Sequence, residues 1–425
     1  KKDDRTIDFK TGLAQMGQLF GTDGIRGMAN QHPITCDVAM KTGQAMGLFC
    51  QKNSKTAVVI GKDTRISGDM LEAAIAAGAA STGVTVFLAG VIPTPGVAYL
   101  CADMDSIGAG IVISASHNPY EDNGIKIFKH GGVKLSDAEE QEIENFILTP
   151  SADNRLTGQV GRILPMPDST ERYADFLVKK FSVTKQARAL NIVVDCSNGA
   201  AFKVAPLVFQ ATGLNALFIH CHPDGKNINH ACGSQYTQDL AVQVRQTQSD
   251  IGLAFDGDAD RLIAIDETGN QISGDQILAI CAQFACERKT LKPRMLVSTI
   301  MSNIGLTIAL EAMGIAHEKA DVGDRKVLEA MITTGAIIGG EDSGHMIFLT
   351  DHTTGDGILS ALKLLEVMLA TGKSLSELAR VMTVYPQVLM NVTVGSDRPD
   401  VMKNKKVADT IMSVEQQLGD QGRSE

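Results

Sequence analysis

Short apolar segments rich in β-branched residues alternate with longer helical segments along most of this chain. Such alternation is typical of α/β folds built on parallel or mixed sheets. The predicted strands are Ala57–Ile60, Thr85–Leu88, Gly110–Ile113, Asn191–Val194, Ala216–Ile219, Ile251–Phe255, Leu262–Ile265, Met295–Val297 and Ala336–Ile338. The predicted helices are Asp69–Thr82 before Gly83, Asp356–Leu369 before Gly372, and one that begins near Ser374, whose spacing to Glu377 fits a capping box.

The length of the chain, 425 residues, corresponds to about three domains at roughly 100–200 residues per domain. Shifts in composition place boundaries in the polar stretch Pro150 to Pro167, at the turn around Gly269, and at Tyr385-Pro386. We expect an N-terminal extension at 1–15 that is not a targeting signal, α/β domains at 16–163, 164–268 and 269–384, and a partial fourth domain at 385–425. The last part contains a strand-like segment, Gln387–Val394, and a helix-like segment, Lys403–Leu418.

The charge of the chain argues against nucleic acid as a partner. Lysine and arginine total 39 against 49 acidic residues, which gives a net charge of −10 that is spread along the sequence. Nucleic-acid binding usually requires a basic patch or stripe. Aromatic residues make up 4% of the chain and tryptophan is absent, so few side chains are offered for base stacking.

The cysteines and the apolar stretches indicate a cytoplasmic protein with no membrane partner. The eight cysteines are scattered without a C-x-x-C pair, which favours reduced thiols. Ala73 to Ala102 carries no charged residue and is long enough for a membrane helix. Glycines and prolines interrupt it, however, so a helix, a strand and a loop account for it better.

A cluster of carboxylates follows the predicted strand Ile251–Phe255. In Asp256-Gly-Asp-Ala-Asp-Arg261, three carboxylates at alternate positions can converge on one hard cation, for which Mg²⁺ is the candidate. A calcium loop of the EF-hand kind is disfavoured because Arg261 stands where that loop needs glycine. A structural acidic turn is the other alternative, although three such close carboxylates repel one another without a cation or a base.

A polar loop, Ser114-Ala-Ser-His-Asn-Pro119, follows the predicted strand Gly110–Ile113. A serine at a strand end, with His117 beside it and Lys126 nearby, is a candidate nucleophile. Ser, Asn and Pro are also ordinary turn formers, so this loop alone does not establish catalysis. No G-x-S-x-G motif surrounds it, so a hydrolase triad is not indicated.

Several loops at strand ends combine basic residues with glycine. They are Phe20-Gly-Thr-Asp-Gly-Ile-Arg-Gly27 with Arg26, Gly61-Lys-Asp-Thr-Arg65, and Asp321-Val-Gly-Asp-Arg-Lys326. Recurrent basic loops in an acidic protein suggest a small anionic substrate. The segment Gly339-Gly-Glu-Asp-Ser-Gly-His345 offers Glu341 and Ser343 as hydrogen-bonding groups for a ligand rich in hydroxyls.

Four further residues superficially resemble a zinc site: Cys221, His222, His230 and Cys232. The segment between them has turn character, and the spacings match no familiar zinc finger. The sequence therefore disfavours zinc at these four positions.

Taken in order, F-G-T-D-G-I-R-G, S-A-S-H-N-P, D-G-D-A-D-R, V-G-D-R and G-G-E-D-S-G-H resemble the α-D-phosphohexomutase superfamily. The resemblance implies three related α/β domains with mixed sheets around a central cleft, followed by a C-terminal α+β domain that is incomplete here. The family's fourth domain carries a loop of the form R-P-S-G-T-E-P, and no such segment occurs in this sequence. Either this sequence omits that loop or the protein lacks it, and in the second case substrate phosphate would be held less tightly.

The resemblance also implies roles for individual residues. Ser116 would carry the phosphoryl group, and its phosphate would hold one Mg²⁺ together with Asp256, Asp258 and Asp260. Around them, Arg261 would support the phosphate, Lys126 and Arg26 would lie near the reacting hydroxyl, Glu341 and Ser343 would grip sugar hydroxyls, and Asp324 and Arg325 would help to select the orientation of the sugar.

The expected reaction is phosphoryl transfer from phosphorylated Ser116 to a hexose phosphate through a 1,6-bisphosphate, with Lys126 handling the hydroxyl proton if its pKa is lowered. Ser114 and the V-G-D-R loop favour the branch of the family that acts on glucosamine phosphates. Asp342 and Lys326 depart from that branch, so mannose or glucose phosphates remain alternatives. A sugar-phosphate-binding protein without activity and a phosphatase are the other hypotheses.

Overall fold

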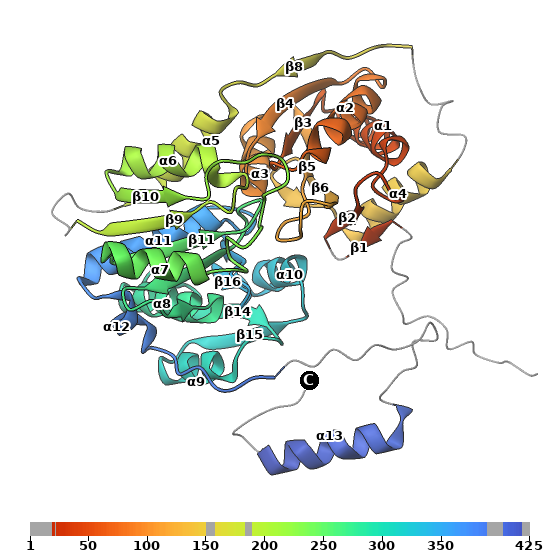
Figure 1. Cartoon of the computed structure of the whole chain (residues 1–425). Coiled ribbons are helices and arrows are strands. Elements are labelled where there is room, and N and C mark those ends of the chain that lie inside the picture. The colour runs from red at the N-terminus through yellow and green to blue at the C-terminus, as the bar shows by residue number, and fades with distance from the viewer. Residues whose placement is uncertain (1–18, 22, 150–157, 183–188, 389–402, 419–425) are drawn as a thin grey trace, which may run out of the picture.

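The computed structural model describes residues 19–21, 23–149, 158–182, 189–388 and 403–418. Three β-sheets follow one another along the chain, and helices cover them (Figure 1). Each sheet mixes parallel and antiparallel pairs, which confirms the predicted fold class. Within the described ranges, no helix is long and apolar enough to cross a membrane.

The first sheet contains eight strands in the order β1-β2-β6-β5-β3-β4-β8, with β7 paired to β6. The parallel strands are β3 (Ala57–Lys62), β4 (Thr85–Val91), β5 (Ile107–Ile113) and β8 (Ile163–Pro165). Antiparallel pairs add β1 (Phe20–Gly21), β2 (Gly24–Met28), β6 (Asp122–Lys129) and β7 (Val133–Lys134).

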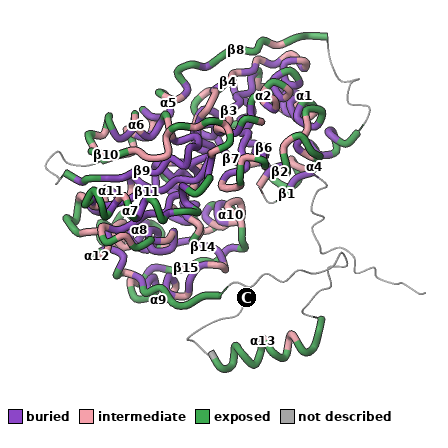
Figure 2. Tube along the Cα trace, in the orientation of Figure 1, coloured by how far each residue is buried: buried purple, intermediate pink, exposed green. Residues whose placement is uncertain are grey.

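Strand β3 shows why this sheet forms the middle of three layers. Successive side chains of a strand point to opposite faces, and β3 is apolar on both. Val58 and Ile60 pack into the core with α1 (Cys36–Lys52), α2 (Ser67–Ala80) and α4 (Asp137–Leu148), whereas Val59 packs into the core with α3 (Thr94–Asp103) and α5 (Ser169–Lys179). β3 and its neighbour β5 are accordingly almost entirely buried (Figure 2).

The second sheet has five strands in the order β10-β9-β11-β12-β13. The parallel strands are β10 (Asn215–Ile219), β9 (Asn191–Asp195) and β11 (Ile251–Phe255), and the antiparallel additions are β12 (Leu262–Asp266) and β13 (Gln271–Ile272). Its helices are α6 (Ala201–Thr212) and α7 (Gln238–Thr247). Because β9 and β11 are parallel neighbours, their carboxyl ends open onto the same edge, where ligands usually bind in such sheets.

The third sheet has four strands in the order β15-β14-β16-β17. These are β14 (Met295–Thr299), β15 (Ala316–Ala320), β16 (Ile338–Gly340) and β17 (Met346–Phe348), and the helices are α8 (Gly274–Glu287), α9 (Ile304–Ala312), α10 (Asp324–Thr334), α11 (Gly357–Thr371) and α12 (Leu375–Ala379). One apolar cluster joins all three sheets, since it contains Val59 of β3, Phe255 of β11 and Ile338 of β16.

Helix ends follow the predicted signals. Asp356 accepts a hydrogen bond from the Leu359 backbone N–H at 2.9 Å where α11 begins, and Gly372 ends that helix in the left-handed conformation at φ +67°. Ser374 and Glu377 form the predicted capping box at α12.

Two sequence expectations differ from the structure. β8 lies inside the stretch expected to be a linker, where Ile163 to Pro165 pair in parallel with β4. The strand expected at Ala336–Ile338 begins at Ile338, because the left-handed Gly335 first ends α10 and the chain needs Ala336 and Ile337 to enter the sheet. The predicted domain boundaries themselves stay a prediction.

The C-terminal part contains α13 (Lys405–Leu418), which agrees with the predicted helix. Most of the predicted strand Gln387–Val394, like the N-terminal extension at 1–15, falls outside the described residues.

Candidate active site

The candidate nucleophile lies directly after β5. Ser116 has the left-handed φ of +52°, and its Oγ donates a hydrogen bond of 2.5 Å to Asp256 Oδ2. Its backbone N–H donates to Ser114 Oγ at 2.9 Å, and Ser114 Oγ donates in turn to Asp63 Oδ2 at 2.5 Å. The loop therefore fixes the serine hydroxyl against the acidic loop of the second sheet.

Two buried side chains brace this loop through its carbonyl oxygens. Arg65 ion-pairs with Asp63 and donates to the carbonyls of Ser116 at 3.2 Å and Asn118 at 2.5 Å. Asn229 Nδ2 donates to the same two carbonyls at 2.8 and 3.0 Å. Arg65 belongs to a loop that the sequence marked as basic, whereas no local signal marked Asn229.

The three predicted carboxylates converge. One oxygen each from Asp256, Asp258 and Asp260 lies within 4.8 Å of the other two, and all three residues are buried. Gly257, between the first two aspartates, cannot carry a side chain without a shift, because a Cβ there would lie 2.6 Å from the Ser116 carbonyl oxygen.

These carboxylates fit a hard cation. Among the described residues, Asp258 Oδ1 and Asp260 Oδ1 are buried without a hydrogen-bond partner. Burial, followed by the neighbouring carboxylates of Asp260 and Asp258, raises the pKa of Asp256 well above its usual range. A cation bound by oxygen ligands would coordinate these two oxygens and offset the repulsion between the three carboxylates.

Lys126, on β6, reaches the same carboxylates. Its Nζ lies 2.8 Å from Asp258 Oδ2, 3.1 Å from Asp260 Oδ2 and 3.2 Å from Asp23 Oδ2. Burial lowers the pKa of Lys126, but these three carboxylates outweigh burial and raise the pKa well above its usual value. The prediction that Lys126 handles the hydroxyl proton required a lowered pKa. In this arrangement the pKa is raised instead, so that requirement is not met.

His117 has the opposite character. Burial, together with the nearby charges of Arg261 and Arg26, lowers the pKa of His117 to about 4. Its Nδ1 lies 3.4 Å from Ser116 Oγ. At neutral pH this imidazole is neutral and can accept a hydrogen bond from the Ser116 hydroxyl, but a pKa of about 4 makes it a weak base.

A cavity of about 540 Å³ opens beside the carboxylates. Its lining includes Arg26, Asp260, Arg261, Asp324 and Glu341, which come from all three sheet units. The volume lies within the usual range of roughly 300–1,000 Å³ for small-ligand sites. The structure thus brings five of the predicted site residues together in one cavity wall.

The other predicted sugar-binding residues lie at the edge of this arrangement. Ser343 Oγ donates to Glu341 Oε2 at 3.3 Å, so these two side chains act together. Arg325 turns toward α4, where its NH1 lies 3.0 Å from Glu140 Oε2 and donates to the Leu135 carbonyl at 3.1 Å.

Three residues with no assigned role in the sequence prediction complete the site. Lys134 Nζ lies 2.5 Å from Asp23 Oδ1 and also ion-pairs with Asp324. His345 Nδ1 lies 3.7 Å from Asp260 Oδ2, and the Nε2 of the same ring lies 3.7 Å from Asp324 Oδ2. Asp23 and His345 stand inside motifs singled out in the sequence, whereas Lys134 lies in no motif.

The models for phosphoglucomutase/phosphomannomutase alpha/beta/alpha domains I, II and III match residues 17–153, 171–269 and 273–385. Relatives named phosphoglucosamine mutase include the following two. The one from Desulforapulum autotrophicum is 55% identical over 96% of this chain and 91% of its own, and the one from Syntrophobacter fumaroxidans is 50% identical over the same shares.

A solved phosphoglucomutase/phosphomannomutase family protein from Burkholderia thailandensis is 27% identical, with a TM-score of 0.75 over 87% of this chain and 79% of that chain. Three matched domain models, relatives at 50% identity or more, and a serine loop that meets an acidic loop across two sheets lead to the same family. The chain belongs to the phosphoglucomutase/phosphomannomutase family, a family of phosphohexomutase enzymes.

Proposed function

We propose that this protein interconverts glucosamine 6-phosphate and glucosamine 1-phosphate through a phosphorylated Ser116 and a 1,6-bisphosphate. The observation that carries the proposal is the 2.5 Å contact between Ser116 Oγ and Asp256 Oδ2, which joins the nucleophile of one unit to the acidic loop of the next. The choice of glucosamine is supported by relatives named phosphoglucosamine mutase at 46–55% identity.

Asp256, Asp258 and Asp260, together with the phosphate on Ser116, would hold one Mg²⁺. When bound, this ion offsets negative charge on the phosphoryl group during transfer. Lys126 remains an ammonium group beside the same carboxylates, so we assign it electrostatic stabilisation rather than proton abstraction.

In the first transfer, the 1-hydroxyl oxygen of glucosamine 6-phosphate bonds to the phosphorus on Ser116. The bond from that phosphorus to Ser116 Oγ breaks, the sugar hydroxyl loses its proton, and the serine hydroxyl is restored. His117, kept neutral by burial and two arginines, has its Nδ1 3.4 Å from Ser116 Oγ and is our candidate for accepting a hydrogen bond from the restored serine hydroxyl.

In the second transfer, Ser116 Oγ bonds to the 6-phosphorus of the bisphosphate, and the 6-oxygen of the sugar leaves with a proton. The product is glucosamine 1-phosphate, and the serine is phosphorylated again. The bisphosphate must reverse its orientation between the two transfers so that each of its phosphoryl groups faces Ser116 in turn. Arg26, Arg261 and Glu341 line the cavity in which this would occur.

Phosphorus NMR of the purified protein with Mg²⁺, a trace of glucose 1,6-bisphosphate and each of three substrates tests the proposal. Glucosamine 6-phosphate should give glucosamine 1-phosphate with a higher kcat/KM than the glucose or mannose 6-phosphates give for their products. Faster turnover of mannose or glucose 6-phosphate would overturn the choice of sugar. Release of inorganic phosphate would indicate a phosphatase, and binding without either product would indicate a sugar-phosphate-binding protein.

A further inference from the structure

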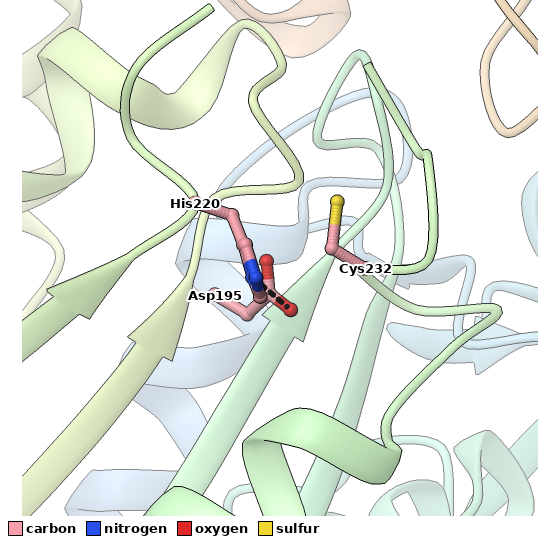
Figure 3. A group of neighbouring side chains, drawn as sticks. All are labelled: Asp195, His220 and Cys232. Atoms are coloured by element: carbon pink, nitrogen blue, oxygen red, sulfur yellow. Dashed lines mark ion pairs between the residues drawn. The ribbon is translucent and has the colours of Figure 1, made fainter. Parts of the chain in front are cut away.

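A second cluster of metal-ligating side chains lies at the carboxyl edge of the second sheet, apart from the aspartate triplet. Asp195 ends β9, His220 follows β10, and Cys232 lies in the loop before α7 (Figure 3). One ligand atom from each residue lies within 4.8 Å of the other two. Asp195 and Cys232 are buried, and His220 is partly exposed.

The distance between two of these ligand atoms suits a tetrahedral ion. With bonds of about 2.0–2.1 Å to nitrogen and oxygen, two ligand atoms of a tetrahedral zinc site lie about 3.3 Å apart. His220 Nδ1 lies 3.1 Å from Asp195 Oδ2. These two atoms form an ion pair that raises the pKa of His220, so a cation would bind here by displacing the proton on Nδ1.

The surrounding groups orient these ligands in the way that metal sites require. The other ring nitrogen, His220 Nε2, faces Asp239 Oδ2 at 3.3 Å, and a carboxylate on the far nitrogen is the usual partner of a metal-bound histidine. Asp195 is fixed by the backbone N–H groups of Ser197, at 2.7 Å to Oδ1, and Gly233, at 2.8 Å to Oδ2. A carboxylate oxygen that accepts one such bond keeps a second lone pair for an ion.

The chemistry of the donor set selects the ion. Sulfur and imidazole nitrogen are preferred by zinc and similar divalent cations, whereas Mg²⁺ prefers oxygen ligands alone. We propose that Asp195, His220 and Cys232 bind one divalent cation of the zinc class, with the fourth position left to water or a small ligand. This site is separate from the all-oxygen site at Asp256, Asp258 and Asp260.

The cluster adjoins the loops that brace the candidate nucleophile. Asn229 lies three residues before Cys232. Its backbone N–H donates to the Ser197 carbonyl at 2.9 Å, and its side-chain amide donates to the Ser116 carbonyl at 2.8 Å. A cation at the cluster would fasten the loop that carries Asn229 to the ends of β9 and β10. Its role would be structural, and the aspartate triplet would keep the chemistry.

The four residues weighed for zinc from the sequence do not form this site. Only Cys232 belongs to it, and His222 and His230 are exposed. These two histidines are therefore matched controls for His220, and the exposed Cys36 is the control for Cys232.

The test measures zinc and cobalt binding to the whole chain in excess Mg²⁺, which occupies the aspartate triplet. Dialysis against zinc followed by elemental analysis should give one zinc per chain, and cobalt should produce the absorption band of thiolate ligation. His220→Ala and Cys232→Ser should abolish the cobalt band, whereas His222→Ala, His230→Ala and Cys36→Ser should keep both signals.

Asp239→Asn provides a variant outside the ligand set, on an exposed side chain, which should fold even if a buried ligand cannot be replaced. It should weaken zinc affinity by about 10–100-fold, the usual cost of losing the partner of a ligating histidine. The proposal would be overturned if wild type bound no zinc in excess Mg²⁺, if the cobalt band persisted in Cys232→Ser, or if Asp239→Asn and His222→Ala had equal effects.

Discussion

Lys126 is the residue whose environment most changes the chemical account of the site. A lysine that served as a base would need to be neutral, yet three carboxylates surround this one and keep it charged. A charge held this way stabilises a transferring phosphoryl group without taking a proton. Lys126 contacts Asp258 and Asp260, so its role depends on whether the aspartate triplet holds a cation.

The first prediction concerns that dependence. Lys126→Met removes a buried ammonium and leaves Asp258 and Asp260 uncompensated, and breaking a buried ion pair in this way costs about 3–5 kcal/mol. Urea unfolding in EDTA should show a loss of about this size, and excess Mg²⁺ should reduce it. Lys52→Met, which breaks an exposed pair with Glu142, should change the free energy of unfolding by only about 0–1 kcal/mol. Equal losses in the two variants would contradict the account.

Asp256 gives the second prediction, which concerns pH. Its pKa is raised in the folded, metal-free protein. At a pH between the unfolded and the folded pKa, the folded state therefore holds a proton that the unfolded chain has lost. The stability contributed by Asp256 is therefore present at low pH and is lost as pH rises through the folded pKa. Mg²⁺ must displace this proton, so its affinity should increase with pH over the same interval.

Calorimetric titration of Mg²⁺ in two buffers with different ionisation enthalpies checks the proton release. The heats should differ below the folded pKa of Asp256 and converge above it, because only a protonated carboxyl releases a proton to the buffer. Identical heats in both buffers throughout would show that Asp256 is already ionised without the ion.

At the scale of elements, α4 is the helix whose start can be tested most simply. Ser136 and Glu139 form a capping box, in which the Ser136 backbone N–H donates to Glu139 Oε2 at 2.8 Å. Ser136→Ala should lower the free energy of unfolding by about 0.5–2 kcal/mol, whereas Ser136→Gly should cost only a few tenths relative to serine. Urea unfolding of both variants measures this, and a larger loss for glycine would argue against capping as the cause.

Elements and motifs were predictable where their signals are local. Strands such as β3 and β11 are continuous apolar runs. The acidic loop after β11 has all three candidate metal ligands within six consecutive residues, so its sequence alone predicts a cation site. β8 was not predictable, because its three residues, Ile163 to Pro165, become a strand only by pairing with the edge of β4. Tertiary pairing can override a polar, proline-containing composition at a sheet edge.

The missed site residues act across long sequence separations. Lys134 meets Asp324 across 190 positions, and Asn229 meets Ser116 across 113. A single lysine or asparagine outside a motif carries no sign of such a partner. The pair Asp195 and His220 was missed for a related reason, since the two residues end adjacent parallel strands and no metal-ligand spacing connects them in sequence.

At the scale of the whole molecule, Lys134 links the first unit to the third. It contacts Asp23 and Asp324, and Arg325 reinforces the link through Glu140. The loop expected to orient the sugar is thus held against the unit that carries the candidate nucleophile, Ser116. The loop with Asp324 and Arg325 and the loop with Ser116 are therefore held at a fixed position relative to each other.

A double-mutant cycle tests the link. Lys134→Met and Asp324→Asn should each lower kcat/KM for glucosamine 6-phosphate, and the double variant should lose less than the sum of the two. Residues in one ion-pair network typically show an interaction free energy of about 0.5–3 kcal/mol. Lys52→Met, which removes an exposed pair with Glu142, serves as the control. Additive losses would mean that the two side chains act independently.

The central claim, that phosphoryl transfer passes through Ser116, is tested most directly by intact mass. The protein is treated with glucose 1,6-bisphosphate and Mg²⁺, and its mass is measured alongside those of Ser116→Ala and Ser114→Ala. The wild-type chain and Ser114→Ala should each gain one phosphoryl group, mapped by peptide fragmentation to Ser116, and Ser116→Ala should gain none. A phosphoryl group that persists in Ser116→Ala, or a wild-type chain that gains none, would contradict the account.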